Sequence, residues 1–194
     1  MNRTAEIKRK TKETDISVKI NIDGSGISNI NTGVGFFDHM LTAFAVHSRC
    51  DLDIVCKGDL NVDCHHTIED VGIVLGQAIS EAIGDKKGIN RYGSAFVPMD
   101  EALGFSALDI SNRPFLVFNC EFLAIKMGDM DTQMVEEFFR ALSFNAGITL
   151  HIKCEYGKND HHKAEAIFKA FAAAFKVAKA YSGYDDFSSS KGVI

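Results

Sequence analysis

The strongest constraint on the fold of this chain is a short motif that occurs twice in matched surroundings. His-His-x-x-Glu begins at His65 and again at His161. Each copy opens an amphipathic stretch of about 15 residues in which apolar side chains recur every three or four positions, and this spacing predicts a helix. Asp63 and Asn159 stand just ahead of the two pairs, where we expect them to be N-caps.

The likeness extends upstream of both motifs. Two β-like segments and two apolar segments align without a gap: 52–54 with 150–152, and 36–44 with 134–142. This alignment places His39 opposite Glu137. Strand-like sequence precedes the apolar segments, at 16–23 in the first half and at 102–110 and 115–122 in the second.

These matches predict an internal duplication. The halves, 1–89 and 90–194, meet near Gly88–Asn90, and each should contain strands, a helix, a strand, a polar loop and a second helix. An apolar face on every element must be covered, so we expect an α+β fold, an α/β sandwich with the helices packed between two outer sheets.

The spacing within the motif predicts metal binding. Residues three or four apart share a helix face, whereas neighbours diverge by about 100°. One histidine of each pair therefore acts with the glutamate, and its neighbour serves a different ion. The eight donors are His39, His65, His66, Glu69, Glu137, His161, His162 and Glu165. Two ions per chain with four protein ligands each would keep open positions, as catalytic metal sites do.

Several alternatives stay open at this stage. Histidine and glutamate also occur in the first turns of ordinary surface helices. Imidazole and carboxylate donors without thiolate suit manganese, iron, zinc, cobalt or nickel, so the donor set does not name the ion. The same ligands would also serve a metal buffer or sensor, or a dinuclear phosphoesterase, whose two ions lie about 3.5–4 Å apart.

Composition narrows the class of protein. A net charge of −5 argues against broad nucleic-acid binding, which needs a basic face. The five cysteines are scattered without a CxxC pair, so we expect reduced, mostly buried thiols. No apolar run is long enough to span a membrane, and the first residues lack the apolar segment of a signal peptide. We therefore expect a cytoplasmic protein.

Other residues carry weaker signals. A phosphate could be held jointly by Arg91, Arg113, Lys169, Ser190 and Lys191, although each alone reads as a surface charge or hydroxyl. The Gly33–Gly35 segment predicts a tight turn before a helix rather than a phosphate loop. The two acids in 98–101 are typical of a turn at a strand end. His47 and His151 have no counterpart in the other half, and we interpret both as structural histidines.

Six segments together resemble the imidazoleglycerol-phosphate dehydratase family. They are 9–14, 35–41, 63–72, 98–103, 159–169 and 189–192, and they span essentially the whole chain in order. The resemblance implies a monofunctional hydro-lyase of histidine biosynthesis, which converts imidazole glycerol phosphate to imidazole acetol phosphate and water. It also implies a hollow shell of 24 subunits, with Mn²⁺ ions, two per subunit, bound where subunits meet.

The resemblance further suggests residue roles. We expect Glu13 of a neighbouring subunit to be the base that removes the substrate's C–H proton, with Glu69 or Glu165 as second choices. The expected substrate-binding residues are His47, Arg91, Asp100, Arg113, Lys169, Ser190 and Lys191. The segment 182–194, rich in Gly and Ser, should be mobile until phosphate binds.

The chain departs from the family pattern at two places. Glu137 stands where many relatives have histidine, which adds negative charge to a metal site. Ala43 and Phe44 stand where a glutamine often follows, so this helix offers no amide to the substrate there.

Overall fold

The structure, a computed structural model, describes residues 3–192. Fourteen elements follow one another along the chain: β1 (Thr4–Lys10), β2 (Thr14–Asn21), β3 (Ser28–Asn31), α1 (Gly35–Ser48), β4 (Asp51–Gly58), α2 (His65–Ile83), β5 (Tyr92–Met99), β6 (Ala102–Ile110), β7 (Phe115–Asn119), β8 (Lys126–Met127), β9 (Met130–Asp131), α3 (Met134–Ala146), β10 (Ile148–Tyr156) and α4 (Asp160–Ala178). None of the helices in this described part is long and apolar enough to cross a membrane, and the cytoplasmic location stays a prediction.

The two halves have the same sheet topology. The first sheet has the order β1-β2-β4-β3 and the second the order β5-β6-β10-β7. In each, the first three strands are antiparallel neighbours, and the last strand is parallel to the one beside it. This correspondence confirms the predicted duplication of two sheet-plus-two-helix halves, whereas the boundary at residue 89 stays a prediction.

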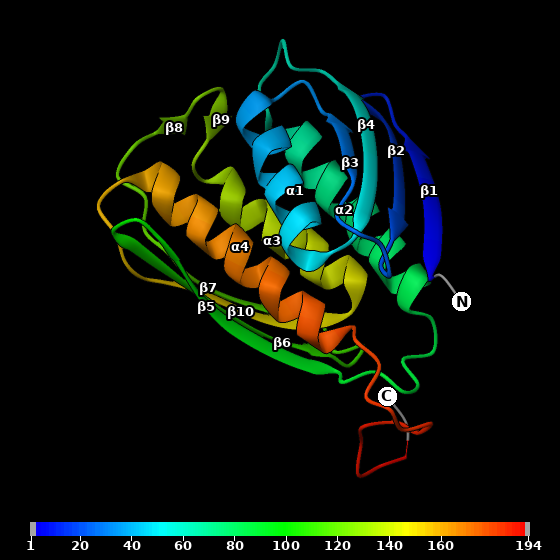
Figure 1. Cartoon of the computed structure of the whole chain (residues 1–194). Coiled ribbons are helices and arrows are strands. Elements are labelled where there is room, and N and C mark those ends of the chain that lie inside the picture. Colours follow the sequence, from blue (N-terminus) through cyan, green and yellow to red (C-terminus); the bar gives the residue numbers. More distant parts are fainter. Residues whose placement is uncertain (1–2, 193–194) are drawn as a thin grey trace.

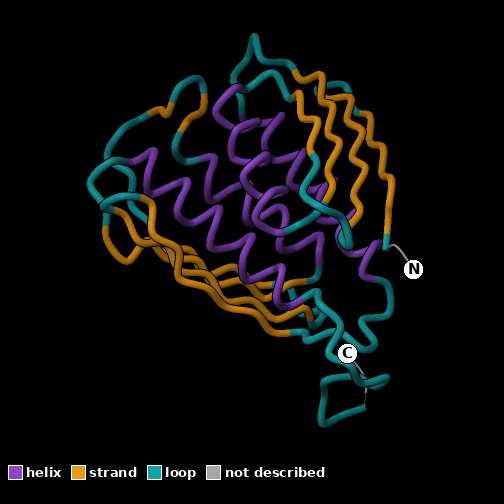
Figure 2. Tube along the Cα trace, in the orientation of Figure 1, coloured by secondary structure: helices purple, strands orange, loops and turns teal. Residues whose placement is uncertain are grey.

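The four helices lie between the two sheets (Figures 1 and 2). Helix α2 covers the first sheet and α4 the second, while α1 packs against α4 and α3 against α2. The two most extensive helix–helix contacts thus each join one helix from each half. The predicted α+β sandwich with outer sheets is therefore the observed architecture.

A cluster of phenylalanines fills the space between the helices. Phe44 of α1 stacks on Phe171 of α4 with ring centroids 5.3 Å apart, and Phe138 of α3 stacks on Phe168 at 5.4 Å. All four rings are at most 2% exposed. Close contact of sheet and helix also fixes α4, because a Cβ added at Gly104 would lie 2.4 Å from the backbone of Ala166. The predicted core role of 168–175 is confirmed.

Two of three local predictions agree with the structure, and one N-cap differs. Asn159 is the N-cap of α4, where its side chain accepts from the backbone N–H groups of His161 and His162. The N-cap of α2 is Cys64 rather than Asp63, which instead accepts from the N–H of His65 at 2.7 Å. Gly33 has a φ of 83°, in keeping with the predicted tight turn.

Candidate metal centre and anion pocket

Three predicted metal donors converge where α1 meets α4. His39 lies in the second turn of α1, and His161 and Glu165 lie four residues apart at the start of α4. The Oε2 atom of Glu165 is 3.6 Å from Nε2 of His39 and 3.3 Å from Nε2 of His161. Within residues 3–192 this is the one group of three or more candidate donors whose ligand atoms all lie within 4.8 Å of one another.

Glu165 is held ionised in this cluster. Its side chain is nearly buried, which opposes ionisation, but Lys169 donates to Oε1 at 2.6 Å. The lysine and the two imidazoles outweigh burial, so the pKa of Glu165 lies below its usual value. The carboxylate is thus available as a ligand. Lys169, predicted to hold phosphate, lies in this cluster and not among the other predicted phosphate residues.

The matching donors of the other half are less closely gathered. His65 and Glu69 lie 3.4 Å apart on α2, both half-exposed. Glu137, on the neighbouring helix α3, pairs instead with Arg140 at 3.7 Å. At the second predicted ion position, His65 and Glu69 therefore lie together, whereas the third donor, Glu137, faces Arg140.

The second histidine of each pair faces away from the first. The rings of His65 and His66 have centroids 6.0 Å apart and planes at 78°, and those of His161 and His162 are 6.1 Å apart at 86°. This divergence is what helical geometry predicts for adjacent residues. Nε2 of His66 and Nε2 of His162 therefore face groups other than those that His65 and His161 face.

Two carboxylates hold these outward histidines. Nδ1 of His66 lies 3.0 Å from Asp59, and Nδ1 of His162 lies 2.6 Å from Glu101. An ionised carboxylate only accepts, so each Nδ1 donates, and in the neutral imidazole each Nε2 then keeps a lone pair, the arrangement that prepares histidine to bind a metal. Hydrogen bonds from His162 and from the N–H of Asn159 lower the pKa of Glu101 to about 2, so it stays ionised.

The sequence analysis missed these two carboxylates. Glu101 is in the turn between β5 and β6, where its acidic neighbours suggested only turn chemistry, and Asp59 lies in the loop after β4. The repeat could not reveal these two carboxylates, because they stand at different distances from their histidines. Asp59 precedes His66 by 7 residues, whereas Glu101 precedes His162 by 61.

Two further predicted residues approach the free nitrogens. Glu13 lies 3.8 Å from Nε2 of His66, and Asp100 lies 3.7 Å from Nε2 of His162. His47 lies two turns beyond His39 on α1, where partial burial and the charge of Lys169 lower its pKa. The structure thus places Glu13 beside a predicted ligand of its own chain.

The remaining predicted phosphate residues share one cavity at the far end of the second sheet. Arg91, Arg113, Ser190 and Lys191 line this cavity of about 740 Å³. Arg91 is buried and bidentate to Asp109, at 2.6 and 3.1 Å, and donates through Nη1 to the carbonyl of Ser188 at 2.6 Å. Arg113 donates to the same aspartate at 3.1 Å. We call this cavity the anion pocket.

The C-terminal segment forms one wall of the anion pocket. The N–H of Gly88 donates to the carbonyl of Asp186 at 2.9 Å, and Lys87 pairs with Asp185 at 2.9 Å. These contacts set the segment against the loop that precedes β5. Its expected mobility stays a prediction, and residues 193 and 194 lie outside the described part.

The metal donors and the anion pocket lie at opposite ends of α4. His161 is in the first turn of the helix, whereas the N–H of Arg91 donates to the carbonyl of Ala178, its last residue. A rise of about 1.5 Å per residue separates His161 from Ala178 by about 25 Å. A small phosphorylated molecule cannot touch both within one chain.

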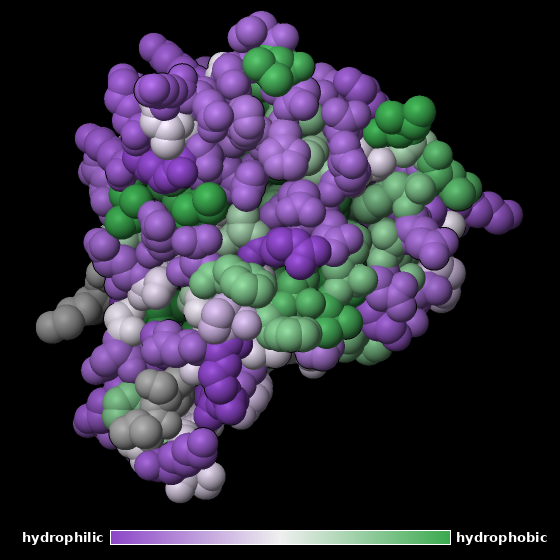
Figure 3. Space-filling view, turned by 180° about the vertical axis from the view of Figure 1, so that it is seen from behind, coloured by the Kyte–Doolittle hydropathy of each residue, from purple (hydrophilic) through white to green (hydrophobic). Residues whose placement is uncertain are grey.

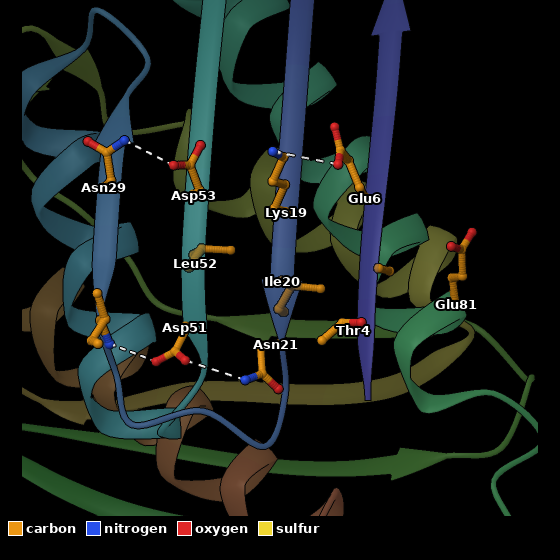
Figure 4. Close-up of a pocket in the computed structure, with 12 residues that line it drawn as sticks. Thr4, Glu6, Lys19, Ile20, Asn21, Asn29, Asp51, Leu52, Asp53 and Glu81 are labelled. Atoms are coloured by element: carbon orange, nitrogen blue, oxygen red, sulfur yellow. Dashed lines mark hydrogen bonds and ion pairs between the residues drawn. The ribbon is translucent and has the colours of Figure 1, made fainter. Parts of the chain in front are cut away.

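A hollow on the outer face of the first sheet has a different character (Figure 4). Its polar side chains pair with one another, as Asn29 does with Asp53 at 3.0 Å and Lys19 with Glu6 at 3.6 Å. None of the predicted metal or phosphate residues lines it. We therefore place no part of the site there.

Together the fold and these groups define a class. A duplicated α+β sandwich that combines an imidazole–carboxylate centre with an arginine-lined anion pocket suits a metal-assisted enzyme for a small anionic substrate.

Comparisons with known proteins identify the family. The family model described as imidazoleglycerol-phosphate dehydratase matches residues 32–175. The protein of that name from Acetivibrio thermocellus is 66% identical over 174 residues, 90% of this chain and 89% of the relative, and that from Clostridium botulinum is 54% identical over 100% and 99%. The crystal structure of the Staphylococcus aureus imidazoleglycerol-phosphate dehydratase has 45% identity and a TM-score of 0.84, over 92% and 99% of the two chains. The chain belongs to the imidazoleglycerol-phosphate dehydratase family, the hydro-lyases of histidine biosynthesis.

The hydrogen bonds to the outward histidines predict an effect on metal affinity. In Glu101→Gln, an amide replaces the anion that fixes Nδ1–H of His162, so we expect the affinity for a divalent metal ion to fall by about 10- to 100-fold. Calorimetric titration of chelator-treated protein measures this. Asp100→Asn serves as the matched control, because its carboxylate faces Nε2 rather than Nδ1. Equal affinity in Glu101→Gln and the wild type would show that Glu101 does not prepare the ligand.

Proposed function

We propose that this chain dehydrates imidazole glycerol phosphate in sites that are completed by neighbouring subunits. The observation that carries this proposal is the separation of about 25 Å along α4 between the His39–Glu165 cluster and the anion pocket. The substrate's phosphate and imidazole are only a few bonds apart. A single molecule must therefore meet the metal donors of one chain and the anion pocket of another.

The outer face of the second sheet supports self-association. Tyr92, Phe96 and Phe115 are 54%, 62% and 58% exposed on it, and Phe96 packs on Phe105 with ring centroids 4.6 Å apart. The first sheet instead bears paired charges such as Lys19 and Glu6. Seen from behind (Figure 3), hydrophobic side chains gather near the middle and toward the right of the view. An apolar sheet face of this kind suits burial between copies, and the family resemblance suggests 24 of them.

The donor set supports two Mn²⁺ ions per subunit. His39, His161 and Glu165 would hold one ion, and His65, Glu69 and Glu137 the other. His66 and His162, whose Nε2 atoms face outward, would complete the shells of neighbouring subunits. Nitrogen and carboxylate donors without thiolate fit manganese, and a carboxylate at Glu137 suits a hard cation. When bound, the metal supplies Lewis-acid charge that polarises the imidazole and hydroxyl of the substrate.

The anion pocket orients the substrate. Arg91 keeps its guanidinium fixed by Asp109, and Arg113, Ser190 and Lys191 add donors around the cavity. Holding the phosphate at a distance from the reacting carbons uses binding energy to place them against the base. Asp109 offsets part of the positive charge, so the pocket does not depend on an anion to remain folded.

Glu13 is the best-placed base. Its carboxylate is half-exposed and lies 3.8 Å from His66, so it enters the shared site together with that histidine. Glu165 is occupied by Lys169 and by its role as a ligand, and Glu69 is held next to His65. A free carboxylate can take the C–H proton, which no adjacent carbonyl makes acidic.

Removing and restoring the metal tests the proposed centre. Wild-type protein freed of metal by chelation should lose activity and regain it with two Mn²⁺ per chain, counted by elemental mass spectrometry. His66→Ala should lose bound Mn²⁺ and large assembly together, as seen by light scattering. Full metal content and full assembly in that variant would contradict a shared site. Lys19→Ala, on the outer face of β2 in the first sheet, is the control that should change neither.

Glu13→Gln tests the base. The substitution keeps size and hydrogen bonding but removes the proton acceptor, so kcat should fall by about 10²- to 10⁴-fold while Mn²⁺ content and assembly stay unchanged. The Glu6→Gln variant, altered on the exposed face of β1, should retain wild-type turnover. Normal turnover of Glu13→Gln would exclude Glu13 as the base.

Mixed assemblies test whether chains share sites. His39→Ala removes a metal donor, and Arg113→Ala with Lys191→Ala removes two donors from the anion pocket. Each variant alone should be nearly inactive. Dissociation and joint reassembly should restore a substantial fraction of activity, because some sites then combine an intact metal cluster with an intact pocket. Activity that stays at the level of the separate variants would place both parts in one chain.

A further inference from the structure

Two cysteines that the dehydratase site does not use face each other across neighbouring strands. β7 and β10 run parallel with Asn119 opposite Lys153, so one residue further Cys120 lies opposite Cys154. Neighbouring strands are about 4.7–4.9 Å apart, inside the Cα separation of about 4.4–6.8 Å that a disulfide bridges. Both side chains turn inward and pack partly buried against the core.

The two thiols lie close enough to affect each other. Cys120 lowers the pKa of Cys154, whereas Cys154 raises that of Cys120, and the thiol of Cys154 donates to the carbonyl of Tyr156 at 3.3 Å. Burial raises the pKa of both thiols, and the charge of Lys163 opposes this rise at both. Cys120 further opposes the rise at Cys154, whereas Cys154 adds to the rise at Cys120, so Cys154 is the more easily ionised of the two.

A small reagent can reach Cys154. A cavity of about 230 Å³ opens beside it, lined by Asn119, Glu121, Cys154, Tyr156, Gly157 and Lys163. Cys120 is not in this lining. Cys50, Cys56 and Cys64 are at most 6% exposed, on other elements of the fold. Cys154 thus combines access from the cavity with a second thiol, Cys120, on the neighbouring strand.

We propose that Cys120 and Cys154 are a redox-active dithiol that closes into an intrachain disulfide when a small-molecule disulfide enters the cavity. The thiolate of Cys154 attacks one sulfur of the reagent, forms a mixed disulfide and expels the first small thiolate. Cys120 then loses its proton and attacks Sγ of Cys154, which expels the second. Two protein thiols are oxidised, and the reagent is reduced to two thiols.

The bond would join two segments that lead to the start of α4. β10 leads directly to the histidine pair at the start of α4, and the segment after Cys120 is held by Asp160, which accepts from the N–H groups of Leu123 and Ala124 at 2.8 and 2.7 Å. The disulfide would therefore tie together the two backbones that reach the first turn of α4.

Oxidised glutathione tests the proposal on the full-length protein with Mn²⁺ bound. After incubation, denaturation and alkylation, mass spectrometry should find three alkylated thiols of the five and a peptide pair joined through Cys120 and Cys154. Cys120→Ser should instead accumulate one glutathione on Cys154, because the resolving thiol is missing. Cys154→Ser should leave Cys120 free, because the cavity does not reach it.

Cys64→Ser is the matched control and should form the same linked peptide as the wild type. Five alkylated thiols after oxidation would overturn the proposal, and so would a disulfide between chains or one that involves another cysteine. Because these readouts count thiols and not turnover, failure here would leave the dehydratase proposal intact.

Discussion

Contact between helices of opposite halves is the constraint on which the site depends. α1 belongs to the first half and α4 to the second, and the stacked rings of Phe44 and Phe171 hold them together. This contact brings His39 to the carboxylate of Glu165. Neither half by itself has the three-donor cluster, so the core determines the chemistry and a cavity among these rings would disturb the metal ligands as well as stability.

Much of the fold and half of the site follow from sequence pattern. Helices and inner strands were predictable because one of their faces is apolar, as at β6, where buried and half-buried residues alternate. The edge strands β1 and β5 were missed, because each has a single fully buried residue, Ala5 and Gly93. The role of Glu101 depends on a turn and a helix that meet only in three dimensions, and no periodicity reports such a meeting.

The two halves have diverged at the ends of their sheets. Arg3 lies directly before β1, makes a bidentate pair with Asp23 and donates to the carbonyl of Lys179. Arg91 lies directly before β5 and does the same in the second half: it makes a bidentate pair with Asp109 and donates to the carbonyl of Ser188. Around Arg91 a cavity opens that Arg113 and Lys191 also line, whereas next to Arg3 the side chain of Lys179 is buried and donates to the carbonyl of Ile22. The duplicated arginine–aspartate pair has thus acquired different surroundings in the two halves.

The ion pair between Lys169 and Glu165 has a consequence for how the protein matures. A nearly buried carboxylate beside two imidazoles needs a countercharge, and the lysine on the next turn of the same helix supplies it. The chain therefore neutralises this carboxylate with a lysine of its own, so its interior can fold at this position without a bound cation.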